Sequence, residues 1–209
     1  MRLYGINIAK EMDIQRFRKG AEPVPATKLQ MIDLGQPILA AVDRVVTATN
    51  MKVGDYTIAA QPVTPRRLTV THTLVGALDT LGHIVIEGTD ILDKDISEIV
   101  VPEEDDTVIT EKIFKSVTKV TGVDWVEDAP TDEDQISVGV DDMLGVHIDL
   151  LDIEQVLFAL LGTEIIVPSA FDEYQLGKLP DAGIDVSGAT YDGTKRLYLL
   201  AYYNDIYVS

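Results

Sequence analysis

Short runs that alternate apolar and polar residues constrain the fold of this chain more than any other feature. Residues 68–73 read Leu-Thr-Val-Thr-His-Thr, and residues 116–121 read Ser-Val-Thr-Lys-Val-Thr. Successive side chains of a β-strand point to opposite faces, so this pattern places apolar residues on one face and polar residues on the other. Such runs are typical of antiparallel strands that have one buried face and one solvated face.

The same pattern recurs along the chain, and turn-forming residues separate the runs. Gly54-Asp55, 79–82 and 103–106 are examples of such turns. The strands that we expect are 42–49, 56–60, 68–73, 83–87, 96–101, 115–120, 135–140, 153–161 and 196–203. Short strands with frequent turns predict a mainly β fold, an antiparallel β-sandwich or barrel-like domain.

The beginning of the chain differs from the remainder, and we expect residues 1–40 to form an extended N-terminal arm or adaptor segment. Residues 19–25 include two prolines and favour a turn or an extended conformation, because proline restricts its own φ and the residue before it. A short helix is expected around residues 10–17. Residues 41–209 are expected to form the β-sandwich domain, either as one unit or with residues 130–209 as a sub-lobe.

The charge of the chain limits its partners. The sequence has 35 Asp and Glu against 17 Lys and Arg, a formal net charge of −18. Such a surface repels phosphate backbones and anionic membranes, so neither nucleic acid nor membrane is an expected partner. The absence of Cys excludes disulfides and thiolate sites. The sequence shows no secretory signal and no apolar run of about 20 residues, so we expect synthesis in a cytoplasm.

Signatures of catalysis and of nucleotide binding do not occur in the sequence. It contains neither a GxSxG nucleophile motif nor a glycine-rich phosphate loop. His72, His83 and His147 lack metal-ligand spacing and are expected on strand surfaces, with His72 and His83 as candidate cross-strand neighbours. A convergent pair of carboxylates stays open, because any two acids can meet in space. We expect the protein not to be an enzyme and to carry no cofactor.

Acidic clusters in the expected loops are candidate Ca²⁺ sites. Carboxylate oxygens at turns are ligands that Ca²⁺ prefers, but none of the clusters matches the EF-hand loop pattern. Solvated turn acids are the competing interpretation. The candidate ligands are Asp105, Asp106, Asp132, Asp134, Asp141 and Asp142.

Candidate partner-binding residues lie at the two ends of the chain. Basic residues in the N-terminal segment are suited to docking on a complementary surface. Tyrosines in the last expected strand suit a pleated surface, with hydroxyls that reach solvent or a partner. The candidates are Arg2, Lys10, Arg16, Arg18, Lys19, Tyr198, Tyr202 and Tyr203.

Two groups of strand motifs resemble a β-rich module of structural proteins from tailed phages and prophages. The first group is residues 66–71 followed by residues 83–90, and the second is residues 96–100 followed by residues 112–120. Each motif is generic by itself, and the order in which they occur carries the resemblance. With later pieces such as Asp192-Gly193-Thr194-Lys195, it covers about residues 65–209.

The resemblance implies a virion structural protein, specifically a capsid decoration or head auxiliary protein, with no catalytic residues to carry over. It implies contacts with the major capsid protein lattice or other virion proteins, a homo-oligomer, and a location on the capsid surface after synthesis in the host cytoplasm. The sequence departs from the module at residues 93–95 and in the long loop expected at 164–191, which leaves the location within the virion open. A tail tube or baseplate component is one alternative. A carbohydrate- or cell-surface-binding sandwich is another, with Trp125 and the C-terminal tyrosines as its aromatic residues.

Overall fold

The computed structural model describes residues 12–14, 27–126, 133–168, 171, 173–185 and 191–204. These residues form strands, the 3-10 turn η1 (Ile153–Gln155) and the loops between them, and they contain no α-helix. The prediction of a mainly β fold is therefore confirmed. No helix in the described part of the chain has the length and apolar character needed to cross a membrane.

The strands pair into three antiparallel sheets. Their bounds are β1 Met12–Ile14, β2 Thr27–Asp33, β3 Ala41–Asn50, β4 Gly54–Asp55, β5 Arg66–Thr73, β6 His83–Thr89, β7 Asp95–Val100, β8 Thr107–Ile109, β9 Ser116–Val123, β10 Gln135–Gly145, β11 Val156–Leu161, β12 Glu164–Ile166, β13 Glu173–Gln175, β14 Gly183–Asp185 and β15 Leu197–Asn204. One sheet has the order β4-β9-β6-β7, a second has the order β13-β14-β10-β5-β8 with β3 also on β10, and a third has the order β1-β2-β15-β11-β12.

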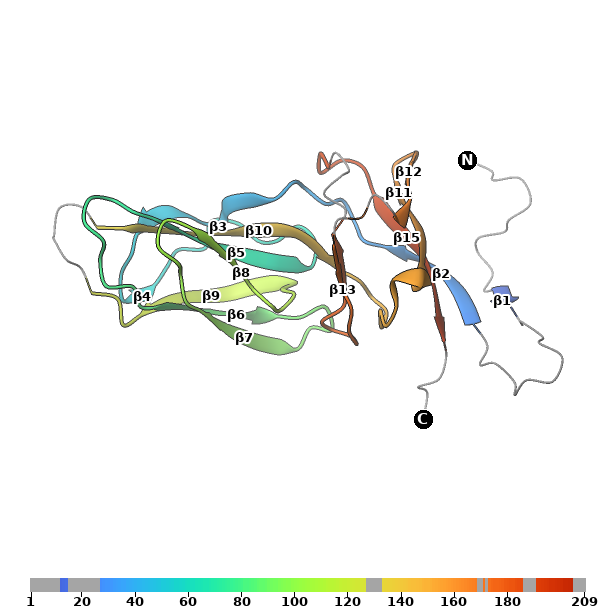
Figure 1. Cartoon of the computed structure of the whole chain (residues 1–209), viewed down its shortest axis with the longest axis horizontal. Helices are drawn as coiled ribbons and strands as arrows, with labels where there is room; N and C mark the ends of the chain where they lie inside the picture. Colours follow the sequence, from blue (N-terminus) through green and yellow to red (C-terminus); the bar gives the residue numbers. More distant parts are fainter. Residues whose placement is uncertain are drawn as a thin grey trace.

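A first hydrophobic core lies between the β6–β9 sheet and the β5–β10 sheet. The two sheets form a sandwich that occupies one half of the elongated molecule (Figure 1). Leu68 and Val70 of β5, Ile84 and Ile86 of β6, and Val120 of β9 are fully buried in this core. The polar residues between them point away from it, as the alternating sequence pattern predicts.

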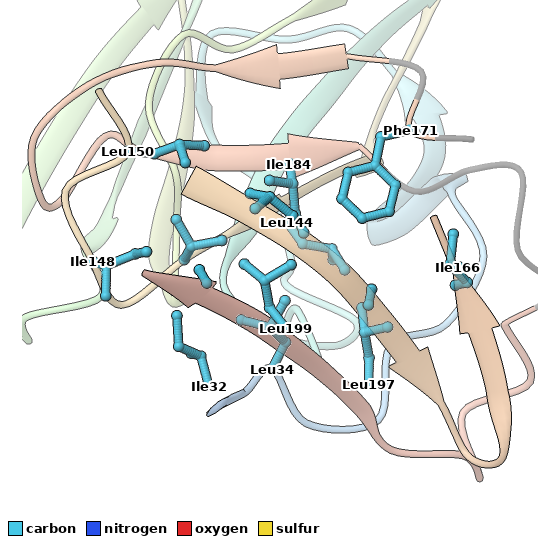
Figure 2. Close-up of a cluster of buried hydrophobic side chains, with 14 of the residues drawn as sticks. Ile32, Leu34, Leu144, Ile148, Leu150, Ile166, Phe171, Ile184, Leu197 and Leu199 are labelled. Atoms are coloured by element: carbon cyan, nitrogen blue, oxygen red, sulfur yellow. The ribbon is translucent and has the colours of Figure 1, made fainter. Parts of the chain in front are cut away.

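A second core lies on one face of the sheet formed by β2, β15, β11 and β12. Figure 2 shows Ile32, Leu199 and Ile166 on that face, directed toward Leu144 and Ile184 of the neighbouring sheet. Strand β10 takes part in both cores, because its first half carries residues of the first core and its last residues contribute Leu144 to the second.

The segment expected to be an arm is in part a strand of the second core. Residues 27–33 form β2, which pairs with β15 from Thr27 opposite Asn204 to Asp33 opposite Tyr198. This segment differs from the expectation because its partner lies at the far end of the chain, where no local pattern reveals it. The expected helix at residues 10–17 is wrong where the structure describes it, since Met12–Ile14 pairs with β2 as strand β1.

Further expectations differ from the structure. Gly54-Asp55, expected as a turn, forms the short strand β4, and residues 153–155, expected as the start of a strand, form η1. Residues 56–60 lie outside any strand, although Tyr56 and Ala59 still form backbone hydrogen bonds to neighbouring strands. His72 and His83 are not cross-strand neighbours, because β5 and β6 belong to different sheets. The long segment 164–191 includes the short strands β12, β13 and β14.

Candidate interaction surface

Strands β15 and β11 are apolar on both of their faces. On β15, Leu199 is fully buried in the second core, whereas its neighbours Tyr198 and Leu200 are half-buried and point to the opposite side of the sheet. On β11, Ala159 is fully buried and Leu160 is half-buried on the same opposite side. A sheet with one solvated face normally alternates apolar and polar residues, so this pattern is typical of strands that are covered on both faces.

The strand register aligns the outward-pointing residues in rows across the sheet. The rows place Ile165 with Leu160 and Tyr198, Phe158 with Leu200 and Met31, and Tyr202 with Leu29. We call these eight residues the outer face. Directly opposed side chains on one face of a sheet contact one another, so the rows form a continuous apolar surface with aromatic rings in it.

The outer face is accessible and nearly free of charge. Ile165 is 64% exposed and Met31 is 44% exposed, and the other members are half-buried. Asp33 continues the first row, and its carboxylate forms an ion pair with Arg196 at the rim. A contiguous apolar surface on a chain with a net charge of −18 is a feature that marks protein contact sites.

The structure places two of the expected partner-binding tyrosines on this surface. Tyr198 and Tyr202 belong to the outer face, whereas the side chain of Tyr203 lies outside the described residues. The basic candidates Arg2, Lys10, Arg16, Arg18 and Lys19 also lie outside them. Sequence reasoning missed the aliphatic members of the face, although the uninterrupted apolar run 156–161 was a signal for them.

The aromatic residues considered for a sugar-binding platform belong to different parts of the molecule. Trp125 is half-buried and packs against the first core. Tyr198 and Tyr202 lie on the sheet that bounds the second core. Trp125 therefore does not share a surface with the two tyrosines, which lie together on the outer face.

A buried polar pair, His72 and Asp134, is a second candidate site. His72 Nε2 lies 3.1 Å from Asp134 Oδ2, and both side chains are fully buried. His72 Nδ1 accepts a hydrogen bond of 2.9 Å from the backbone N–H of Asp105. Asp134 accepts further bonds from the backbone N–H groups of Val75 and Asp79, at 2.7 and 3.0 Å. His72 is thus a core residue, and the expectation that it lies on a strand surface is wrong.

The contacts of this pair define its role. Because Nδ1 accepts a hydrogen bond, the neutral ring carries its proton on Nε2, toward Asp134. Burial alone would raise the pKa of Asp134, but the backbone N–H groups of Val75 and Asp79 and the His72 ring together bring this pKa below its ordinary value. Nδ1 accepts a backbone hydrogen bond, Nε2 lies beside the Asp134 carboxylate, and both side chains are buried, so the pair ties loops together inside the protein.

Arg66 forms a second buried polar centre. It lies close to the part of β10 where the strand leaves the first core and enters the second. Its side chain is fully buried. Nε donates to the carbonyl of Asp141 at 2.5 Å and Nη1 donates to the carbonyl of Ile38 at 3.0 Å, while Nη2 lies 3.5 Å from a carboxylate oxygen of Asp142. Burial raises the pKa of Asp142. The hydrogen bond from the N–H of Ala40 and the charge of Arg66 lower it by less, so the pKa lies above its ordinary value. This centre joins the chain before β3 to the bulged part of β10.

The acids expected as Ca²⁺ ligands have structural contacts where the structure describes them. Asp134 lies beside His72, and the carboxylate of Asp142 lies beside Arg66. Asp141 accepts a hydrogen bond from Arg66 through its backbone carbonyl. Asp106 caps its own turn by accepting the N–H of Thr107. Asp132 lies outside the described residues. Within the described ranges, no group of three or more His, Asp and Glu side chains is arranged to hold a metal ion.

The outer face is therefore an apolar surface of the described chain that is available to a partner. Comparisons of the chain with protein-family models, with curated proteins and with solved structures found no match.

Proposed function

We propose that the protein is a non-enzymatic structural component of a tailed-phage virion, which decorates or stabilises the capsid through protein–protein contacts. The observation that carries the proposal is the outer face, an apolar surface on strands whose opposite face already belongs to a core. A protein that acts through protein–protein contacts needs such a surface. Strands with two apolar faces are stable when both faces are covered, and a lasting contact with another protein covers the second face.

The chemistry of the buried polar groups supports a structural role. His72 and Asp134 are engaged with each other and with backbone N–H groups, and Arg66 is engaged with two carbonyls. Groups held in this way stabilise a single conformation, and they lack the accessible titratable side chain that acid–base or nucleophilic catalysis requires.

The sequence resemblance supports the virion assignment. Its motifs coincide with strands of the sandwich, since residues 66–71 lie in β5, residues 83–89 form β6, and residues 96–100 lie in β7. The acidic surface fits as well. The net charge of −18 on each chain makes its assemblies repel one another, which keeps them in solution until they meet a complementary site on a particle.

Immunogold electron microscopy of phage particles from the source lysate tests the proposal, with an antibody raised against the recombinant protein. We expect label over the heads. Label confined to tails would move the protein to the tail tube or baseplate. Protein that stays free in the lysate, with no label on any particle, would overturn the virion assignment.

A further inference from the structure

We infer that the outer face of one chain is covered by the outer face of a second copy, in a dimer with two-fold symmetry. The inference deepens the proposed function and rests on its premise that this face is a protein contact. It names the partner of the face as the chain itself. In such a contact the two five-stranded sheets stack face to face, about 10 Å apart.

The outer face needs a cover from the moment the chain folds. Leu160, Tyr198 and Leu200 lie on strands that also build the second core, so the outer face exists as soon as the domain folds. An apolar surface that waits for a distant partner promotes aggregation in the meantime. A second copy of the chain is present wherever the protein is made, and it can cover the face from that moment.

The charge of the chain restricts where two copies can touch. Two copies with a net charge of −18 each repel strongly, so they can meet only where carboxylates are scarce or neutralised. The members of the outer face are aliphatic or aromatic, and the carboxylate of Asp33 at its rim is paired with Arg196. The outer face thus lets two acidic copies approach without opposing unpaired negative charges.

The size of the outer face is compatible with a dimer contact. The rows span four strands with a spacing of about 4.8 Å, and they extend over a similar length along the strands, roughly 20 Å in each direction. Two such faces stacked on each other bury on the order of 1,000 Å² in total, which is about the lower bound for a specific interface. The contact therefore has room for a dimer of moderate affinity, whose population depends on concentration.

The chain offers a matched pair of double variants as a test. Ile165 and Ile99 are both isoleucines on edge strands and are both 64% exposed, but only Ile165 belongs to the outer face. Met31 of the outer face and Leu92 of the β6–β7 turn are both 44% exposed. The test variant is Ile165→Glu with Met31→Glu, and the control is Ile99→Glu with Leu92→Glu. Both add the same charge at equally exposed sites.

Sedimentation equilibrium of the full chain over a range of micromolar concentrations gives the readout. We expect dimers for the wild type and for the control, and a dissociation constant raised at least tenfold for the test variant, because each copy brings two carboxylates into the apolar contact. Circular dichroism and thermal unfolding would check that both variants are folded. A wild-type chain that stays monomeric, or a control that dissociates as much as the test variant, would overturn the inference.

A second measurement uses the absence of cysteine from the chain. A single thiol introduced by Leu200→Cys lies in the middle row of the face, and one introduced by Ile99→Cys lies on β7. A short thiol-specific cross-linker should join two copies of the first variant and leave the second as monomers, and equal cross-linking of both contradicts the dimer. These tests need no phage particle. A dimer that fails to bind heads would overturn the proposed function alone, and a monomer that binds heads would overturn the dimer alone.

Discussion

His72 and Asp134 lie 3.1 Å apart, Nε2 to Oδ2, with both side chains fully buried at one end of the first core. The two residues come from different parts of the chain, His72 from β5 and Asp134 from the residue before β10. Backbone N–H groups of Asp105, Val75 and the buried Asp79 complete the arrangement. The pair thus holds three loops against the end of the sandwich, and the protonation state of Asp134 is linked to stability.

Acid should destabilise the protein through Asp134. The folded-state pKa of this carboxyl lies below its ordinary value, so its contribution is present above the unfolded-state pKa of about 3.9 and is lost as the pH falls through the folded-state pKa. We expect the free energy of unfolding, measured by urea denaturation, to decrease below about pH 4. Asp134→Asn should make the free energy of unfolding less dependent on pH in this range. Asp43→Asn, at an exposed position, should leave the pH dependence as it is. Equal pH dependence of the two variants would contradict this role.

Arg66→Met should reduce the free energy of unfolding by about 3 kcal/mol, because it removes the buried partner of Asp142 and of two carbonyl groups. The neighbouring Arg67 is a matched control, since it is half-buried and donates one side-chain hydrogen bond, to Gln175. Arg67→Met should cost roughly 1 kcal/mol or less. Chemical denaturation of both variants measures the difference, and equal losses would show that Arg66 has no special role.

Gly139→Ala should disrupt the pairing of β10 with β3. A Cβ at this position would lie 2.0 Å from the carbonyl oxygen of Ala41 and cannot be accommodated without moving the backbone. We expect a loss of at least about 2 kcal/mol in unfolding free energy. Gly177→Ala is the control, because the nearest atoms to its Cβ are 3.8 Å away. Thermal unfolding compares the two, and a stable Gly139→Ala variant would mean that β3 shifts readily.

Leu199 and Leu200 are neighbours on β15 and point to opposite faces of the sheet. Leu199→Ala should cost about 2–5 kcal/mol in unfolding free energy, because it leaves a cavity in the second core. Leu200→Ala should cost less in the isolated chain, since Leu200 is only half-buried there, but it should weaken self-association. Unfolding and sedimentation measured on both variants give this crossed pattern. Equal effects of the two substitutions on association would contradict the assignment of opposite faces.

Local pattern was enough to identify most of the long strands. The alternation of residues 68–73 and 116–121 is a property of the residues themselves, and both runs lie in strands, β5 and β9, with their apolar residues in the first core. The apolar run 156–161 likewise lies in β11, which has apolar side chains on both faces. Of the outer face, the sequence predicted Tyr198 and Tyr202 as contact residues.

Tertiary structure alone decided which strands pair and which residues become buried. Thr27–Asp33 has a weak strand pattern and becomes β2 only because β15, at the other end of the chain, offers it an edge. His72 has the environment of a core residue because Asp134 reaches it from another strand. The sequence by itself determined the period of the strands and their apolar faces, because those depend on adjacent residues. The pairing of the strands, the division into two cores and the exposure of the outer face depend on contacts between distant segments, which no local pattern encodes.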